Sequence, residues 1–430
     1  MLGTKAVLAI IIFICTYALI ITEKVQRTII ALFGAMLMIV LGILTQEQAI
    51  THIDFNTIGL LTGMMIIVNI TAETGLFNYL AIWAAKKVKA DPIRLLVVLS
   101  ALTAICSAFL DNVTTVLLTV PVTFSITAQL KLPVYPYLVA QILAANIGGT
   151  ATLIGDPPNI MIGSAVKHLD FMSFLTNLAP ICLLIFAVTI AILILVYRKQ
   201  FHTCAELKKQ VMNLDEHTQL RRPVLMKKCL FVLFVTVVGF MFHSKLGLES
   251  ATIAMSGACL LMLISMHARE KIIAKVLSRL EWLAIFFFAG LFMLVGGLVE
   301  TGVIKMLAEK VMSFTQGDLK MTSMLIIWIS SLASSFVDNI PFVATMIPLI
   351  KDMGSMGMTN LDPLWWSLSL GACLGGNGTI VGASANVVVI GMASQHGRPI
   401  KFLEFMKLAF PLMILSIIMS SIYIYIRYLL

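Results

Sequence analysis

Three aspartates lie inside long apolar stretches of the sequence, at Asp111, Asp156 and Asp338. A carboxylate is expensive at membrane depth, and function is the usual reason for its presence there. Such a group can bind and release a proton, or it can hold a cation. Asp111 and Asp338 also precede apolar helical segments, where they can act as N-caps that accept backbone N–H bonds. The two roles are compatible, and the sequence leaves both open.

Neutral polar residues and glycines surround these aspartates. An asparagine follows both Asp111 and Asp338, and a Gly-rich segment follows each pair, at 148–159 and 375–386. The hydroxyl and amide groups can bind a solute, or they can satisfy backbone groups freed by a break in a helix. We predict that protons or cations are coupled at Asp111, Asp156 and Asp338. We predict that the solute and ions are bound by Asp111, Asn112, Thr114, Thr115, Gly148, Gly149, Thr150, Thr152, Asn159, Asp338, Asn339, Gly375, Gly376, Asn377, Thr379 and Asn386.

The two clusters are copies of each other. Adding 227 to a residue number in the first gives its counterpart in the second, as from Asp111 to Asp338. A gapless match over so much of the chain indicates an internal duplication. Asp156 breaks the symmetry, because its counterpart is Ala383. Since the second copy needs no carboxylate there in order to fold, we expect Asp156 to serve function.

The composition is that of a membrane protein. Hydrophobic residues make up 60% of the 430 residues and charged residues only 12%, against about 25% charged in a typical soluble protein. Apolar runs of about 20 residues, long enough to cross a bilayer, recur along the chain. These features predict a polytopic, all-α membrane protein. The net charge of +9 is then attributed to cytoplasmic loops, and no nucleic acid partner is expected.

Motifs of enzymes and metal sites are missing from the sequence. It contains no H-E-x-x-H, G-x-S-x-G or P-loop motif, and its seven cysteines form no C-x-x-C pair. An intramembrane aspartyl protease is disfavoured, because the chain has no G-x-G-D motif and a protease needs no duplicated unit. We therefore expect no enzyme activity, no metal site and no cofactor apart from a coupling ion.

The apolar pattern predicts two repeats, 1–197 and 229–430, joined by a basic linker at 198–228. A polar tip between two apolar arms predicts a re-entrant hairpin in each repeat, and a Gly-rich interruption predicts a broken helix. A hairpin adds no net crossing, so each repeat crosses the membrane five times and the two repeats are inverted. The predicted hairpins are 92–131 and 321–350, and the predicted broken helices are 137–166 and 364–393.

The distribution of positive charge predicts the orientation. If the linker is cytoplasmic, 22 Lys and Arg lie on its side and 8 on the other, out of 30. The first set includes Lys24, Arg27 and Arg269. This bias agrees with the positive-inside rule. We expect a multi-pass protein of the cell membrane, with a cytoplasmic linker and both termini outside.

The chain resembles the ion transporter superfamily. The resemblance rests on the two hairpins, the two broken helices, the D-N tips, and the run Asn146-Ile-Gly-Gly-Thr150 followed by Gly155-Asp-Pro-Pro-Asn159. The most similar branch holds arsenite-efflux permeases, the melanosomal P protein and one type of sodium/proton antiporter. The resemblance implies a homodimer and an elevator motion of the hairpins and broken helices. For an arsenite pump it also implies a cytoplasmic ATPase subunit as a partner.

Sodium–dicarboxylate symporters are more distant relatives, and the hairpin tips separate them from this chain. Their tips read Ser-Asn-Thr and bind sodium, whereas the tips here begin with Asp111 and Asp338. A carboxylate in place of a serine repels an anionic substrate. It suits a cation, or a neutral solute exchanged for protons.

These observations predict a secondary active transporter of a small inorganic solute, coupled to protons or sodium and working by alternating access. Arsenite or antimonite efflux is the first expectation. Sodium/proton antiport and sodium-coupled transport of dicarboxylate or citrate are the alternatives. A channel built from the same hairpins would be recognised by a conductance far above the turnover of a carrier.

Overall fold

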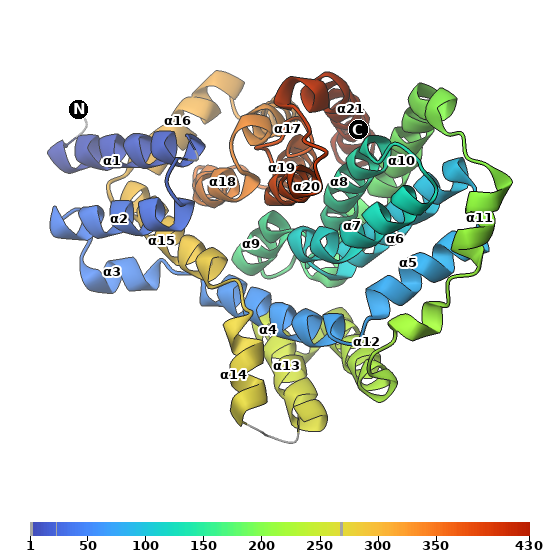
Figure 1. Ribbon diagram of the computed structural model, residues 1–430. Coiled ribbons are helices and arrows are strands. Elements are labelled where there is room, and N and C mark those ends of the chain that lie inside the picture. Colours follow the sequence, from blue (N-terminus) through green and yellow to red (C-terminus); the bar gives the residue numbers. More distant parts are fainter. Residues whose placement is uncertain (1–2, 23, 267–269) are drawn as a thin grey trace.

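The computed structural model describes residues 3–22, 24–266 and 270–430, and within them every regular element is a helix (Figure 1). Arg269, which contributed to the charge count, lies outside the described residues. The first half contains α1 (Thr4–Ile21), α2 (Arg27–Val40), α3 (Gln46–Thr51), α4 (Phe55–Ala72), α5 (Leu76–Lys87), α6 (Pro92–Phe109), α7 (Asn112–Gln129), α8 (Tyr135–Thr150), α9 (Pro157–Ala165) and α10 (Phe171–Tyr197).

The short α11 (Ala205–Met212) leads into the second half. That half contains α12 (Pro223–Leu246), α13 (Ser250–Met266), α14 (Glu270–Ser278), α15 (Trp282–Glu300), α16 (Val303–Thr315), α17 (Leu319–Phe336), α18 (Asn339–Ser355), α19 (Asp362–Gly375), α20 (Ser384–Gln395) and α21 (Phe402–Ile424). The helix α12 begins inside the predicted linker, because Pro223 occupies its first turn, where a missing N–H costs nothing.

Eight of the described helices are long and apolar enough to cross a membrane, which supports a multi-pass membrane protein. They are α1, α4, α6, α10, α12, α15, α17 and α21. Ten crossings, five in each repeat, were predicted from the sequence by counting a different set of segments. That count left out α6 and α17 as hairpin arms, and it included the shorter α2 and α13 and the two broken helices. The number of crossings therefore stays a prediction.

Corresponding helices begin at corresponding residues. The starts of α4, α5, α6, α7, α8 and α9 are each separated by 227 from the starts of α15, α16, α17, α18, α19 and α20. The ranges of the predicted hairpins contain the helix pairs α6–α7 and α17–α18, and those of the predicted broken helices contain α8–α9 and α19–α20. Re-entry of the hairpins into a membrane stays a prediction. Local signals repeat as well: Asp91 caps α6 as Asp318 caps α17. Gly75 and Gly302 both enter the next helix with a positive φ, of +80° and +75°, which favours glycine.

A helix of each half packs against a helix of the other half. Helix α4 lies on α13, and its counterpart α15 lies on α2. At both contacts a glycine faces backbone: a Cβ at Gly63 would lie 2.6 Å from the carbonyl carbon of Ala254, and one at Gly290 would lie 2.9 Å from that of Ala31. Small residues allow such close approach between membrane helices. This reciprocal packing is what a two-fold relation between the repeats requires.

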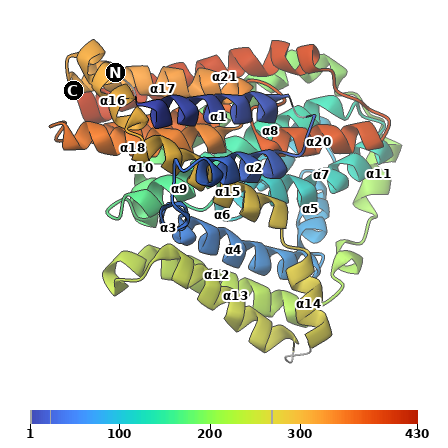
Figure 2. The same ribbon diagram turned by 90° about the vertical axis from the view of Figure 1, so that its left-hand side faces the viewer.

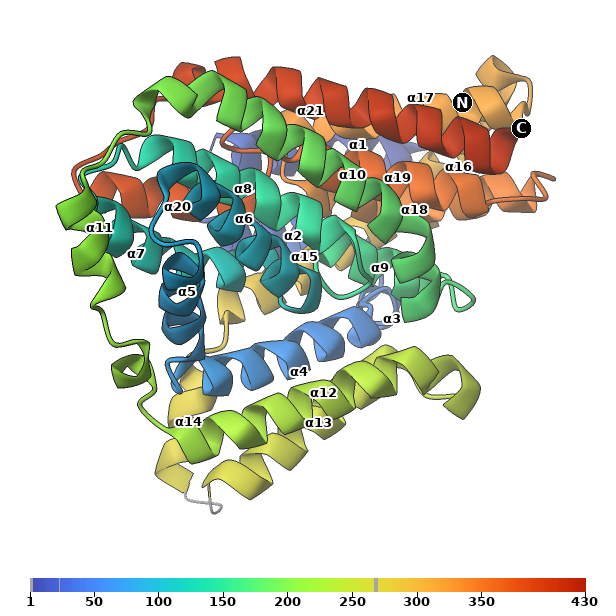
Figure 3. The same cartoon turned by 90° about the vertical axis from the view of Figure 1, so that its right-hand side faces the viewer.

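The chain between the halves is bound to the first half. Both termini lie at one end of the molecule and α11 lies at the other (Figure 3). The Thr203 hydroxyl donates to the Leu130 carbonyl (2.9 Å), and the Arg221 N–H donates to the Thr74 carbonyl (3.0 Å). Between these points Lys86 forms an ion pair with Glu216. The linker is therefore a strap across the outside of α5.

Candidate functional site

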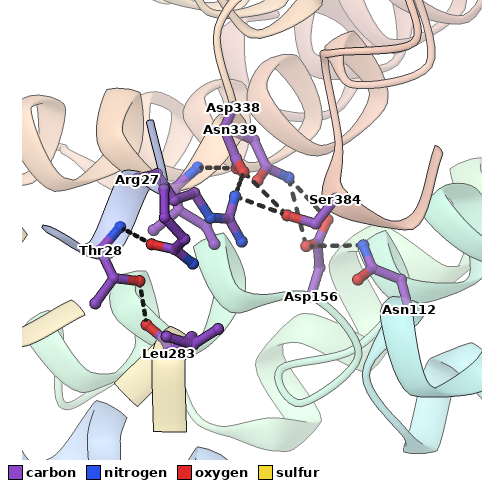
Figure 4. Close-up of polar contacts among 10 residues, drawn as sticks. Arg27, Thr28, Asn112, Asp156, Leu283, Asp338, Asn339 and Ser384 are labelled. Carbon is purple, nitrogen blue, oxygen red and sulfur yellow. Dashed lines mark hydrogen bonds and ion pairs between the residues drawn. The ribbon is translucent and has the colours of Figure 1, made fainter. Parts of the chain in front are cut away.

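The tips of both hairpins meet the break of the first broken helix at Asp156 (Figure 4). This residue precedes α9 and is 1% exposed. The Asn112 Nδ2 donates to its Oδ1 (3.3 Å), and the Asn339 Nδ2 lies 3.4 Å from each of its oxygens. Among the described residues, no Lys, Arg or His forms an ion pair with it. The amides of Asn112 and Asn339 therefore hold this carboxylate from both hairpin tips.

Asp111 caps the second arm of the first hairpin. Its Oδ1 accepts the N–H groups of Val113 (2.8 Å) and Thr114 (3.0 Å), and its Oδ2 accepts the Thr114 hydroxyl. Both oxygens are therefore engaged within one turn of α7. The capping role that the sequence allowed for Asp111 is present in the structure.

Asp338 caps α18 with only one of its oxygens. Its Oδ1 accepts the Ile340 N–H (3.2 Å). The counterpart of Thr114 is Pro341, which has neither an N–H nor a hydroxyl to donate. The Oδ2 of Asp338 is therefore free to accept the Ser384 hydroxyl (3.0 Å) and to pair with Arg27.

The glycines at the breaks are required by close backbone packing. A Cβ at Gly148 would lie 2.2 Å from the Ala104 carbonyl oxygen, and one at Gly375 would lie 2.6 Å from that of Ser331. Helices α8 and α19 therefore lie directly against the hairpin arms α6 and α17. The four predicted glycines, Gly148, Gly149, Gly375 and Gly376, are packing positions in this structure.

Several predicted binding residues satisfy backbone freed by the breaks. The Asn159 Nδ2 donates to the carbonyls of Thr150 (3.0 Å) and Thr152 (2.8 Å). The Asn386 Nδ2 does the same for Gly376 (2.7 Å) and Thr379 (2.8 Å). The hydroxyls of Thr152 and Thr379 donate to carbonyls at the ends of the hairpin arms, those of Ala108 and Ser335. Local satisfaction, which the sequence had left open, is observed for these residues.

Asn146 links the two repeats. Its Nδ2 donates to the Oδ1 atoms of Asn377 (2.9 Å) and Asn386 (3.0 Å), and its Oδ1 accepts from Asn112 (3.2 Å). Its counterpart is Cys373, whose Sγ lies 3.6 Å from the Asn159 Oδ1. A continuous chain of amides therefore leads from Asp156 through Asn112 and Asn146 into the second repeat.

A small cavity of about 40 Å³ lies beside Asp156. Of the predicted site residues, Asp111, Asn112, Asp156 and Asn339 line it. Asp338 reaches it only through Arg27 and Ser384, which line it as well. The remaining predicted residues do not line the cavity: Thr114, Thr115, Gly148, Gly149, Thr150, Thr152, Asn159, Gly375, Gly376, Asn377, Thr379 and Asn386.

Sequence reasoning missed two charged residues of this cavity, Arg27 and Glu281. Arg27 was interpreted as a loop charge, yet it occupies the first turn of α2, which has no acidic residue. A cation at a helix N-terminus faces the positive end of the helix dipole, and this unfavourable placement was a usable signal. Glu281 precedes α15 and is the counterpart of Asp54. Among the described residues, no three His, Cys, Asp or Glu are grouped closely enough to hold a metal ion.

Comparison with known proteins identifies the family to which the chain belongs. The family described as "Citrate transporter" matches residues 17–371. The chain belongs to this family. Among its relatives are a 46 kDa membrane protein of Mycobacterium leprae, 42% identical over 99% of both chains, and a protein of Mycobacterium tuberculosis named as an uncharacterised transporter, 40% identical over 98% of this chain and 99% of the relative. The human P protein is 33% identical over 98% of this chain and 60% of its own length.

Two solved structures share the fold of the citrate transporter family member described here. The YdaH transporter of Alcanivorax borkumensis aligns with a TM-score of 0.61 at 12% identity, over 99% of both chains. The MtrF protein of Neisseria gonorrhoeae aligns with a TM-score of 0.57 at 12% identity, over 99% of this chain and 95% of that one. The membership and the P protein relative confirm the predicted resemblance to the ion transporter superfamily. The chain is a membrane transporter, as its relatives are named.

Proposed function

We propose that this chain is a secondary active transporter that moves a small inorganic solute across the cell membrane, coupled to protons or sodium through Asp156. Arsenite or antimonite efflux is the first candidate, and sodium/proton antiport through the same site is the alternative. The observation that carries the proposal is the carboxylate of Asp156, which is buried between amides of both hairpin tips. Such a group is available to a proton or a cation, because no Lys, Arg or His among the described residues forms an ion pair with it.

The charges around the cavity favour a cation or a neutral solute. Three carboxylates line it, those of Asp111, Asp156 and Glu281, against the one guanidinium of Arg27. The volume of about 40 Å³ is enough for roughly one to three water molecules. A trihydroxide such as neutral arsenite carries donors for carboxylate and amide oxygens. A polyanion would meet repulsion in this cavity.

Citrate is a second candidate, which the family membership favours. To enter a cavity with this excess of carboxylates, citrate would need cations to accompany it. A dependence of citrate uptake on an added cation would therefore distinguish this candidate from simple anion transport.

We also propose the elevator motion and the homodimer that the resemblance implies, in a membrane with the linker on the cytoplasmic side. Close glycine packing supports movement of the hairpins and broken helices as one body. In contrast, single polar contacts link α1 and α2 to the second hairpin: the Tyr17 hydroxyl donates to the Pro341 carbonyl (2.8 Å), and Arg27 pairs with Asp338. Figure 2 shows α1 and α2 beside α18, at the border that such a movement would cross.

The test is flux in proteoliposomes under an imposed pH or sodium gradient, with arsenite, sodium and citrate compared. We expect arsenite or sodium flux to follow the gradient in the wild-type protein. Asp156→Asn keeps the shape of the side chain, so the variant should fold while its gradient-driven flux falls at least about tenfold, the effect of one lost charge-assisted interaction. Unchanged flux and an unchanged pH profile in Asp156→Asn would refute coupling at this residue.

A further inference from the structure

Arg27 lies between two cavities. The inner one is the 40 Å³ cavity beside Asp156. The outer one is a groove of about 280 Å³ between the α1–α2 connection and the second hairpin with α20. Arg27 and Ser384 are the residues that line both. The side chain of Arg27 therefore separates the groove from the buried carboxylate.

The guanidinium is held by parts of the protein other than its own helix. Its Nη1 pairs with the Asp338 carboxylate and donates to the Ser384 Oγ (3.0 Å), as Figure 4 shows. Its Cζ lies 4.9 Å from the centre of the Phe287 ring, within the range of a cation–π contact. Two of these three partners belong to the second hairpin and the second broken helix.

The backbone of Arg27, in contrast, is anchored to α2 and α15. The Gln26 Oε1 accepts the Thr28 N–H (2.5 Å), which caps α2. The Thr28 hydroxyl then donates to the Leu283 carbonyl (2.7 Å), which ties this turn to α15. The side chain therefore reaches from a fixed turn across to the hairpin, and its contacts break if the hairpin moves relative to α2.

The anion that holds Arg27 is exposed enough to be reached from the groove. The side chains of Arg27 and Asp338 are 33% and 10% exposed. Charged groups face Arg27 from several elements: Asp338 from α18, Glu281 from the start of α15, and Asp111 and Asp156 from across the inner cavity. Four carboxylates thus surround one resident cation, so its departure leaves a site that attracts another cation.

We infer that Arg27 is the resident counter-cation and gate of the Asp156 site. Its guanidinium lies at Asp338 between the outer groove and the inner cavity, and its displacement opens the path for a proton or metal cation from the groove to Asp156. The inference rests on the proposed function for the identity of the entering ion. The gate itself is a geometric statement that can be tested without any transport.

The test uses a thiol placed in the inner cavity. Ala284 lines that cavity and not the outer groove, so Ala284→Cys is introduced into the full chain after its seven cysteines are replaced. The rate of modification by a small cationic methanethiosulfonate is then measured on the purified protein. Arg27→Gln should raise this rate about tenfold, the factor for one lost charge-assisted hydrogen bond. Equal rates with and without Arg27 would overturn the gate.

Matched variants separate the gate from a general loss of charge. Arg222→Gln removes a guanidinium that pairs with Glu73 (3.4 Å) and lines neither cavity, and it should leave the rate unchanged. If Arg27→Gln does not fold, Ser384→Ala removes one of the two hydrogen-bond partners of Arg27 and should raise the rate severalfold. An unchanged rate in that variant would contradict the inference equally.

Transport supplies the second readout. Without Arg27 the entering ion has no competitor, so the half-saturating concentration of the coupling ion should fall about tenfold in Arg27→Gln. An unaltered half-saturating concentration in a variant that still transports would overturn the counter-cation role. If no variant transports any tested solute, the proposed function fails while the thiol measurement still decides the gate.

Discussion

Asn112 and Asn339 hold equivalent positions in the two repeats, and both donate to the carboxylate of Asp156. Two symmetric donors therefore converge on an acceptor that has no symmetric partner, since the second repeat has Ala383 in its place. The two repeats supply equivalent donors, but only the first repeat supplies the carboxylate to which they donate. The difference between Asp156 and Ala383 can therefore distinguish residues that maintain the fold from residues that serve transport.

The first prediction uses that internal control. In Asp156→Ala the backbone at the break should hold, because Ala383 precedes α20 with a similar extended conformation (φ −147° against −141°). We expect a monodisperse protein whose gradient-driven flux falls at least about tenfold, for the loss of one charge-assisted interaction. Placing the carboxylate in the other repeat, with Ala383→Asp added, should not restore flux. Recovery of flux in this double variant would show that the two positions are interchangeable.

The second prediction concerns Asn146 and its counterpart Cys373. Asn146→Ala leaves the oxygens of Asn377 and Asn386 without this donor, so it should lower the free energy of unfolding by about 1–3 kcal/mol. Cys373→Ala should cost no more than about 1 kcal/mol, as for a methyl-sized gap, because the Asn159 Oδ1 keeps its bond from Ser369 (2.5 Å). Melting of the two purified variants checks the order. Equal losses would mean that the amide chain does not stabilise the repeat contact.

The third prediction compares two glycines in broken helices. Gly148→Ala forces a Cβ to within 2.2 Å of the Ala104 carbonyl oxygen and should destabilise the protein by about 1–3 kcal/mol. Gly391 in α20 has no atom within 4 Å of such a Cβ. Its replacement by Ala should be neutral or stabilise the helix by up to about 1 kcal/mol. Thermal unfolding in detergent distinguishes the two, and a tolerated Gly148→Ala would argue against rigid packing of α8 on α6.

The fourth prediction concerns the strap. The Lys86 ammonium donates to the Glu216 carboxylate and holds the pKa of that group below its ordinary value of 4.5. A lowered pKa stabilises the folded protein above the unfolded value, and this stability disappears as the pH falls through the folded pKa. Glu216→Gln should therefore melt below wild type at neutral pH and converge with it as the pH falls well below the ordinary value of 4.5. Glu206→Gln, at a residue without an ion pair among the described residues, should match wild type throughout.

Many of the helix boundaries could be predicted from the sequence, because the duplication presents each local pattern twice. The helix ends near residues 110, 150, 337 and 376 were anticipated from polar residues and glycines in apolar surroundings, at positions such as Asp111 and Gly148 that recur in the second copy. Arg27 was missed for a related reason. The constant offset holds from α4 onward but not in the first helices, since α13 starts 223 residues after α2. No comparison therefore drew attention to Arg27.

The roles of polar residues that are repeated in the two halves of the chain were less predictable. Asn159 and Asn386 both donate to the carbonyl of the equivalent threonine, Thr152 and Thr379, and the sequence could not decide between this role and solute binding. The decision depends on where a carbonyl lies after the helix breaks, which is a property of packing across some 10 residues of loop. Asp338 shows the same limit, because only the fold reveals that its second oxygen pairs with Arg27 and accepts the Ser384 hydroxyl.

The bonds from Asn146 to Asn377 and Asn386 also set an order of events during synthesis. These partners are 231 and 240 residues further along the chain. At ribosomal speeds of roughly 5–20 residues per second, Asn146 reaches the membrane about 10–50 seconds before they are made. Asn339 is 183 residues further along the chain than Asp156, so it is made after a similar delay. Until the second half is made, Asn112 is therefore the partner that the first half supplies to both Asn146 and Asp156.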